Sequence, residues 1–301
     1  MFHHFYDQRH PRGQGAMSSA DLESLIAHIG RDRILPARLW HEKALAGALK
    51  PGDLCLTFDD NLRCQFDVAL PVLRRFKLTA FWFIYTSVFR GCLERLELYR
   101  QLRTLHYATV DAFYDQFFAA IDAGPHAGMV RDRLTGFEPA DYLREFPFYT
   151  QRDRIFRFVR DEVLGQIRYF NTMDRMMHDA GVAPGDLARS LWMDENNLRE
   201  LDREHHVIGL HSHTHPTRIG QLSAQDQRIE YAANQAILAE ILGHKPTTMS
   251  HPCNSYSPAT GPVLESLGIR LGFRANMAQA GDSLLEQPRE DHANLLKRMA
   301  A

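Results

Sequence analysis

The sequence predicts an α/β fold built around a parallel sheet. Short runs of strand-forming residues alternate with longer segments of helical periodicity, and this alternation is typical of parallel sheets. Polar clusters follow directly after two of the runs, which is where α/β proteins place their ligands. The chain has 301 residues, of which 45% are hydrophobic, so it can bury a substantial core.

The first part of the chain predicts two helices and two strands. Residues 20–30 and 66–76 are amphipathic with helical spacing. Residues 53–58 form a short apolar run that predicts a buried strand, and residues 78–84 predict a second strand. The longest apolar run, residues 78–89, is interrupted by threonines and is too short to span a bilayer.

The later part of the chain continues this alternation. Ser223 can cap a long helix over residues 223–242. The remaining predicted elements are strands at residues 207–210, 247–250 and 271–274 and a helix at residues 258–267. We expect the strands to join one parallel sheet.

The pattern changes between about residues 90 and 190. Residues 93–123 and 149–180 predict long helices, and the segment 124–128, which contains glycine and proline, breaks them. The first of these helices includes the aromatic residues Tyr107, Phe113, Tyr114, Phe117 and Phe118. We expect these side chains mainly to form helix core. The alternative is that a few of them line a substrate cleft or a subunit interface.

Two carboxylates follow the strand predicted at residues 53–58. Side chains that are adjacent on an extended backbone point to opposite faces, so Asp59 and Asp60 could serve different tasks if the chain turns there. One could ligate a metal ion while its neighbour handles a proton. The alternative is that both of them, with Asn61, are simply turn residues.

Three histidines, His211, His213 and His215, follow the strand predicted at residues 207–210. His211 and His215 share one face whether the segment is extended or helical, whereas His213 shares it only in an extended segment. Two imidazoles and one carboxylate form a donor set that suits a divalent cation and leaves one position open for water. The acidic and histidine clusters together therefore predict one metal site.

Three segments resemble the motifs of the polysaccharide deacetylases, which form the NodB-homology family or carbohydrate esterase family 4. Residues 56–60, Leu-Thr-Phe-Asp-Asp, and the helix pattern after them resemble the first motif. Residues 208–216, Ile-Gly-Leu-His-Ser-His-Thr-His-Pro, resemble the second motif, and residues 250–256 form the third region. The resemblance covers about residues 55–90 and 190–295.

The resemblance implies a distorted or incomplete (β/α) barrel of the NodB-homology type, with site residues at the carboxyl ends of the strands. Family members usually cross the interval at about residues 90–190 with a shorter segment. Residues 1–301 are therefore expected to form a single catalytic domain with a helical insertion at about 90–190, which lies over the barrel mouth.

The matching residues have known tasks in this family. The resemblance implies Asp60, His211 and His215 as metal ligands and Asp59 as the general base. The backbone N–H of Cys253 would help to hold the oxyanion. Zinc suits two imidazoles and one carboxylate, although cobalt, nickel, manganese or iron could occupy the same cage.

Two histidines compete for the role of the general acid, which protonates the leaving amine. Residues 1–5 resemble the opening segment of family members in which circular permutation has moved the last motif to the front, and this resemblance implies His3 as the acid. The alternative is His292, which occupies the place of the final motif in unpermuted members, although no apolar strand precedes it. His4 should face away from the site and is expected to be structural.

The chain departs from the family pattern after the first motif and within the third. Asn61 replaces the usual glycine and still suits a turn, because asparagine tolerates left-handed backbone angles. The third motif has Ser250 or His251 where the family commonly has an arginine. Arg289 could supply the missing positive charge near Asp59 and keep that base ionised. The alternative for Arg289 is a surface residue at a helix start.

The predicted function is that of a metal-dependent N-deacetylase acting on an N-acetylated amino sugar, with water activated by the metal and Asp59. Cys253, Asn254 and His292 are the predicted substrate-binding residues. One alternative is a hydrolase of another C–N amide, such as a formamide, cyclic amide or ureide, on the same fold. Another is a catalytically silent sugar-binding homologue, but binding alone would not need both a metal cage and a spare carboxylate.

The composition restricts the expected partners and location. The formal net charge is −2, so nothing indicates a surface for nucleic acid or anionic membranes. Cys55, Cys64, Cys92 and Cys253 form no C-x-x-C pair and fit reduced thiols. The amino terminus has no secretory signal pattern, so we expect a cytoplasmic protein whose substrate is a precursor of a surface polysaccharide. The sequence does not indicate an oligomeric state.

Overall fold

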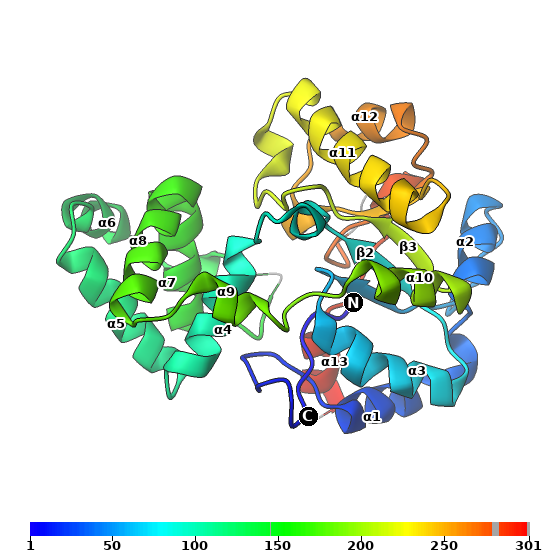
Figure 1. Ribbon diagram of the computed structural model, residues 1–301, viewed down its shortest axis with the longest axis horizontal. Coiled ribbons are helices and arrows are strands. Elements are labelled where there is room, and N and C mark those ends of the chain that lie inside the picture. Colours follow the sequence, from blue (N-terminus) through cyan, green and yellow to red (C-terminus); the bar gives the residue numbers. More distant parts are fainter. Residues whose placement is uncertain (145, 279–282, 300–301) are drawn as a thin grey trace. The chain divides into compact units, whose positions relative to one another are not determined.

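The computed structural model of the protein describes residues 1–144, 146–278 and 283–299 (Figure 1). Strands and helices alternate along much of the chain, as the sequence predicts. Among the described residues, no helix has both the length and the apolar character needed to cross a membrane.

The chain divides into two compact units. The barrel unit comprises residues 1–10, 15–94 and 191–301, and it contains all the strands of the described residues. The helical unit comprises residues 11–14 and 95–190. The boundaries of the helical unit agree with the change of pattern seen in the sequence at about residues 90 and 190.

A five-stranded parallel sheet forms the centre of the barrel unit. Its strands lie side by side in chain order: β1 (Thr57–Asp59), β2 (Phe81–Ile84), β3 (Val207–Leu210), β4 (Thr248–Ser250) and β5 (Leu271–Phe273). Each strand overlaps the apolar run that predicts it. The sheet curls into a half-barrel surrounded by helices, which confirms the predicted incomplete (β/α) barrel.

Short segments near the two ends of the chain flank the outer strands. Phe2 forms a parallel bridge with β1, and Gln287 forms one with β5. The amino group of Met1 donates to the carbonyl of Glu290 at 2.6 Å, and the carbonyl of Met1 accepts from the N–H of His292 at 3.2 Å. The amino-terminal residues therefore lie between β1 and the carboxyl-terminal segment.

Alternate side chains of β2 enter two separate hydrophobic clusters, because successive residues of a strand point to opposite faces. Trp82 stacks on Phe58 of β1 in the larger cluster, with ring centroids 4.3 Å apart. Phe81 and Phe83 join Phe273 of β5 in the smaller cluster. Both faces of the strand are thus covered, as is usual for parallel sheets.

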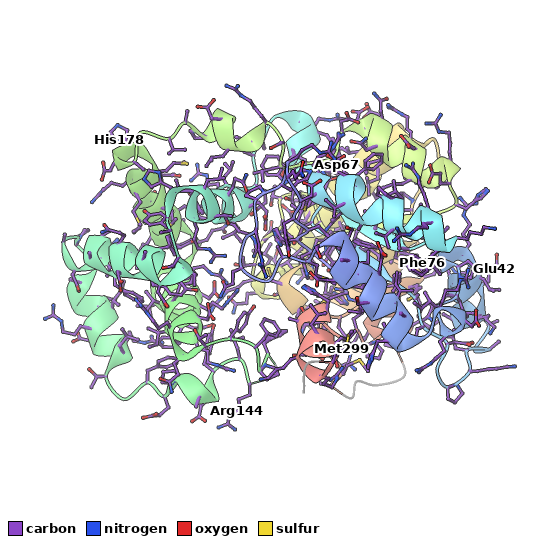
Figure 2. All side chains as sticks on the ribbon, turned by 90° about the horizontal axis from the view of Figure 1, so that it is seen from below. Glu42, Asp67, Phe76, Arg144, His178 and Met299 are labelled. Atoms are coloured by element: carbon purple, nitrogen blue, oxygen red, sulfur yellow. The ribbon has the colours of Figure 1, made fainter. Side chains whose placement is uncertain are left out.

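Helices surround this sheet (Figure 1). They are α1 (Ser19–Ile29), α2 (Ala37–Leu45), α3 (Leu70–Phe76), α10 (Glu195–Arg203), α11 (Ala224–Leu242), α12 (Thr260–Ser266) and α13 (His292–Met299). A π-helical turn, Gln65–Ala69, leads directly into α3. Helix α1 packs against α3 and α13, and α10 and α11 pack against β3. Figure 2 labels Phe76 and Met299 at the ends of α3 and α13.

Side-chain caps determine where several of these helices begin. Ser18 and Asp194 begin capping boxes at α1 and α10. The side chain of Ser223 accepts a hydrogen bond from the N–H of Asp226 at the start of α11. The predicted serine cap of this helix is therefore confirmed.

The described residues of the helical unit form α4 (Arg95–His106), α5 (Val110–Asp122), α6 (Ala127–Leu134), α7 (Gln151–Phe158), α8 (Gly165–Asp179) and α9 (Pro184–Ala188). The prediction of single long helices at residues 93–123 and 149–180 is wrong, because each is broken. Thr109 caps α5 with its side chain and so starts a new helix. Between α7 and α8 lies the π-helical turn Val159–Leu164, followed by Gly165, whose φ of 67° interrupts the helical backbone.

Aromatic side chains form the core of the helical unit. Phe113, Tyr114 and Phe117 are buried on α5 and pack around Phe156 of α7, with ring centroids 5.0 to 5.4 Å from it. The prediction of helix core is confirmed for these three residues. The other two aromatic residues singled out in this segment are partly buried.

Candidate metal centre

Asp60 and His211 come to the same edge of the sheet because each follows a strand that pairs with β2. The N–H of Asp60 donates to the carbonyl of Phe83 at 3.1 Å, and the N–H of His211 donates to that of Ile84 at 3.2 Å. Each residue therefore lies directly at the carboxyl end of its strand. This is the edge at which parallel α/β folds carry their sites.

The chain turns sharply after Asp59. Asp60 and Asn61 have φ values of 80° and 57°, in the left-handed region that residues other than glycine rarely adopt. The turn directs the Asp60 carboxylate toward His211, whereas the Asp59 carboxylate pairs with Arg289. Asp59 and Asp60 are both buried, and their carboxylates have different partners inside the protein.

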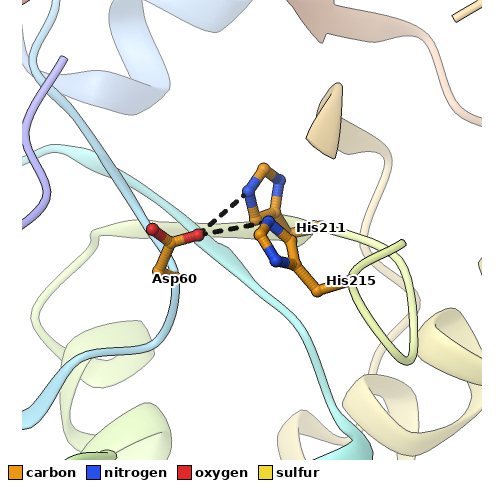
Figure 3. Close-up of side chains that lie close together, drawn as sticks. All are labelled: Asp60, His211 and His215. Atoms are coloured by element: carbon orange, nitrogen blue, oxygen red, sulfur yellow. Dashed lines mark ion pairs between the residues drawn. The ribbon is translucent and has the colours of Figure 1, made fainter. Parts of the chain in front are cut away.

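Asp60, His211 and His215 converge on one point (Figure 3). Oδ1 of Asp60 lies 3.3 Å from Nε2 of His211 and 3.4 Å from Nε2 of His215. One ligand atom of each residue lies within 4.8 Å of the others. His213 is engaged elsewhere, since its Nδ1 hydrogen-bonds with the hydroxyl of Thr86 at 3.0 Å. The structure thus brings together the three side chains expected to be metal ligands.

The loop after β3 folds back on itself and so brings His215 to His211. Ser212 and His215 have left-handed φ values of 62° and 55°. The N–H of His215 donates to the hydroxyl of Ser212 at 3.2 Å, and the imidazole rings of His211 and His215 lie 4.9 Å apart. Backbone strain of this kind is frequent at functional sites.

The donor atoms of these residues fit a divalent cation. Nδ1 of His211 donates to the carbonyl of Ser250 at 2.9 Å, so Nε2 of the neutral ring carries a lone pair. This lone pair faces a carboxylate oxygen of Asp60, and two acceptors tolerate such closeness only when a cation or a proton lies between them. The ligand atoms of a tetrahedral ion with bonds of about 2.1 Å are roughly 3.4 Å apart, which matches the observed spacing.

The charges around the site favour the same conclusion. Burial alone would raise the pKa of Asp60, but the neighbouring imidazoles of His211, His215 and His3 hold that pKa well below its usual range. Burial alone would lower the pKa of His211, yet the carboxylates of Asp59 and Asp60 raise it. These groups therefore stabilise a positive charge between them.

Asp59 is held by a buried arginine. Nη1 and Nη2 of Arg289 donate to its two carboxylate oxygens at 2.7 and 2.8 Å, which is a bidentate pair. Burial would raise the pKa of Asp59, but the charge and hydrogen bonds of Arg289 outweigh it and lower that pKa to about 2. Asp59 is thus an ionised carboxylate at neutral pH. Arg289 has a relative exposure of only 4%, so it is not a surface residue.

His3 lies beside these carboxylates. Its Nε2 is 3.9 Å from Oδ2 of Asp60, and its side chain is 28% exposed. The side-chain amide of Gln65 donates to the carbonyls of both His3 and Asp59, at 2.8 and 2.5 Å, and so ties the two segments together. The imidazole of His3 is therefore both close to Asp60 and partly open to solvent.

His292 is buried in contacts that differ from those of His3. Its Nε2 hydrogen-bonds with the carbonyl of Gly15 at 2.9 Å, and its Nδ1 lies 3.4 Å from the carboxylate of Asp291. Its ring stacks with that of Phe2 at 6.0 Å. Burial lowers the pKa of His292. His3 thus lies beside Asp60, whereas the ring nitrogens of His292 face Gly15 and Asp291, and the identity of the general acid stays a prediction.

The loop of the third motif follows β4. Cys253 and Asn254 have left-handed φ values of 50° and 56°. Cys253 is exposed, and the side-chain oxygen of Asn254 accepts the N–H of Ala275 at 2.7 Å. Asn254 therefore braces the loop. The substrate-binding roles of Cys253 and Asn254 stay predictions.

Two buried polar residues outside the motifs form hydrogen bonds with the segments that carry the site residues. Asn234 on α11 accepts the N–H of His211 at 2.9 Å and donates to the carbonyl of Ile84 at 2.9 Å. Gln65, in the π-helical turn before α3, supports Asp59 as described above. A polar residue within the apolar stripe of a helix is the sequence signal for such a role, because a buried amide must find hydrogen-bond partners.

Comparisons with known proteins concern the family and the fold of this chain. A family model described as polysaccharide deacetylase matches residues 175–272. No curated protein matches the sequence. Among solved structures, the Streptococcus pyogenes deacetylase PplD in complex with acetate is similar over 99% of this chain and 96% of that chain, with 14% identity and a TM-score of 0.55.

Two further solved structures are similar. IcaB from Ammonifex degensii matches over 99% of this chain and 93% of that chain, with 16% identity and a TM-score of 0.55. The deacetylase domain of BpsB from Bordetella bronchiseptica matches over 95% and 87%, with 14% identity and a TM-score of 0.51. At these identities the likeness shows the fold. The family-model match and this fold together confirm the resemblance that the motifs predict: residues 175–272 are similar to the polysaccharide deacetylases, and the fold is of the NodB type.

Proposed function

We propose that this protein is a metal-dependent N-deacetylase that removes the acetyl group from an N-acetylated amino sugar of a polysaccharide or its precursor. The observation that carries the proposal is the convergence of Asp60, His211 and His215 beside the clamped carboxylate of Asp59. Zinc is the proposed metal, because a carboxylate and two imidazoles with an open fourth position form a typical catalytic zinc site. The cytoplasmic location expected from the sequence stays a prediction.

Each residue of the site has a distinct task in this proposal. A cation held by Asp60, His211 and His215 would polarise the amide carbonyl and lower the pKa of a water molecule. Asp59, ionised and buried, accepts a proton from the attacking water. Arg289 keeps this carboxylate charged and fixes its two oxygens, so the orientation of the base is set before the substrate binds.

The remaining steps concern the leaving group and the oxyanion. His3 is proposed to protonate the leaving amine, which its position near Asp60 and its partial exposure support. The backbone N–H of Cys253 is proposed to stabilise the negative charge that develops on the carbonyl oxygen. The left-handed backbone at Cys253 supports this assignment, because it gives the N–H a direction that an extended strand would not.

The proposal is tested by acetate release from N-acetylhexosamine oligomers with zinc-loaded protein. Asp59→Asn removes the proton acceptor and should lower kcat by roughly 10²- to 10⁴-fold while zinc binding is retained. The control Asp53→Asn changes a carboxylate that pairs with Lys43 at 2.7 Å before β1, and it should keep the wild-type turnover.

Other outcomes of the same assay would contradict the proposal. Turnover of formamides, cyclic amides or ureides without acetate release would assign the protein to a different amide hydrolase. A zinc-loaded wild-type protein that binds N-acetylated sugars but turns over none of these compounds would be a sugar-binding protein.

A further inference from the structure

We propose that Ser250 is a positioning residue that couples the proposed base to the proposed metal ligands, an inference that rests on the proposed function. Ser250 ends β4 and is completely buried. Its two oxygens contact different residues of the site. The hydroxyl contacts Asp59 and Arg289, and the main-chain carbonyl contacts His211.

The hydroxyl of Ser250 lies between two opposite charges. Nη2 of Arg289 donates to Oγ at 2.7 Å, and Oγ donates to Oδ2 of Asp59 at 3.1 Å. Nη2 also donates directly to the same Oδ2 at 2.8 Å, so the three groups form a closed ring of hydrogen bonds. A guanidinium can only donate and a carboxylate can only accept, which leaves the serine proton a single orientation.

The carbonyl of Ser250 acts on the other half of the site. It accepts Nδ1–H of His211 at 2.9 Å, which orients Nε2 of that ring toward Asp60. Carbonyl and hydroxyl belong to one residue at the end of a strand, and the hydrogen bonds of the hydroxyl to Arg289 and Asp59 hold its side chain in one rotamer relative to the carbonyl. Ser250 therefore determines how the Asp59 carboxylate lies relative to His211, whose Nε2 is 4.0 Å from Oδ2.

This coupling matters because proton transfer is sensitive to the orientation of the base. A displacement on the order of 1 Å can cost 10²-fold in rate. Arg289 holds both oxygens of Asp59 from one side only. The serine hydroxyl adds a contact to Oδ2, the oxygen near His211, and so restricts further the movement of a carboxylate that Arg289 already holds at both oxygens.

The test uses Ser250→Ala, which removes the hydroxyl and keeps the carbonyl that holds His211. We expect kcat for acetate release to fall roughly 10- to 100-fold, with KM and the zinc dissociation constant unchanged within about twofold. Ser250→Thr keeps a hydroxyl at the same carbon and should regain most of the lost kcat. If Ser250 had only a structural role, Ser250→Ala would lower the thermal midpoint, and kcat would not fall selectively while KM stays unchanged.

Thr248 provides a matched control. It lies two residues earlier on β4, on the same face of the strand, and is equally buried. Its hydroxyl has no hydrogen-bond partner within the described part of the chain. Thr248→Val therefore removes a buried hydroxyl from the same strand without touching Asp59, and it should leave kcat at the wild-type value.

The possible outcomes separate this inference from the proposed function. A kcat of Ser250→Ala within about twofold of wild type, or an equal loss in Thr248→Val, would overturn the role of Ser250. A change confined to KM or to zinc affinity would overturn it as well. If the alanine variant does not fold, Ser250→Cys, which is similar in size but a weak donor, carries the same expectation. A wild-type protein that releases no acetate would instead refute the proposed function.

Discussion

Left-handed backbone angles at Asp60 and His215 aim two of the three proposed metal ligands. Each such residue costs on the order of 1 kcal/mol and persists only where its surroundings hold it. The N–H of Asp60 is held by the end of β2, and that of His215 by the hydroxyl of Ser212. Local strain at these two residues is thus balanced by the hydrogen bonds that surround them.

The two candidate acids can be told apart by substitution. His3→Asn removes the partly exposed imidazole 3.9 Å from Asp60, so we expect kcat to fall roughly 10²-fold while zinc binding is retained. His292→Asn disturbs a buried contact with Gly15, so it should lower the thermal midpoint and leave kcat largely unaffected. Steady-state rates of acetate release decide the matter, and a large loss in kcat for His292→Asn alone would assign the acid to that residue.

The sequence predicts the proposed metal ligands better than it predicts the residues that hold Asp59 in place. Asp60, His211 and His215 could be grouped from the sequence because each follows an apolar strand, and the ends of parallel strands share one edge. The support of Asp59 depends on distant residues: Arg289 is 230 positions away and Ser250 is 191 positions away. The role of Arg289 could be expected only from the family resemblance, and no local pattern encodes the contact of the Ser250 hydroxyl, which only the folded barrel unit creates.

The strands of the barrel unit follow from the sequence more directly than the helices of the helical unit. An apolar run that is buried on both faces is a strong signal, and β3 spans the same residues, Val207–Leu210, as its predicted run. The long helices predicted at residues 93–123 and 149–180 are interrupted where Thr109 caps a new helix and where Gly165 takes a positive φ. Helical periodicity continues across such breaks and therefore does not reveal them.

The fit between β5 and the segment that carries Arg289 depends on a glycine. A Cβ at Gly272 would clash with the main-chain carbonyl of Leu285. Gly272→Ala should therefore destabilise the protein by about 1–3 kcal/mol and lower the midpoint of urea unfolding. Gly261→Ala is the control, because a Cβ there, on α12, meets nothing within 4 Å, and it should be neutral or stabilise by up to about 1 kcal/mol. Equal effects of the two substitutions would contradict this explanation.

His206, which precedes β3, should make stability depend on pH. Its Nδ1 accepts the N–H of Ala80 at 3.0 Å and the indole N–H of Trp82 at 3.1 Å. Burial lowers the pKa of His206 to about 4. Because the unfolded chain binds this proton at a pH near 6.5, stability should fall by on the order of 3 kcal/mol as the pH drops from about 6.5 to 4.

Urea unfolding at several pH values checks this dependence. In His206→Gln the side chain does not titrate, so part of the stability loss between pH 6.5 and 4 should disappear. The control His28→Gln replaces an exposed histidine on α1 and should keep the wild-type dependence. The same pH dependence in wild type and His206→Gln would show that other groups are responsible.

At the scale of the whole molecule, the candidate site draws on segments from the entire barrel unit. His3 comes from the amino-terminal segment, Asp59 from β1, His211 from the end of β3, Ser250 from β4 and Arg289 from the segment after β5. These residues meet only in the folded half-barrel, so the site depends on the fold of the whole unit. The α/β class could be predicted from the alternation of elements, whereas the single domain with an insertion stays a prediction.

A metal ion bound by Asp60, His211 and His215 is central to the proposed function. Anomalous X-ray diffraction from crystals of the zinc-loaded protein tests this directly. We predict one anomalous peak about 2.0–2.2 Å from a carboxylate oxygen of Asp60 and from Nε2 of each histidine. A zinc-loaded protein whose anomalous peaks all lie away from these three side chains would contradict the proposed metal site.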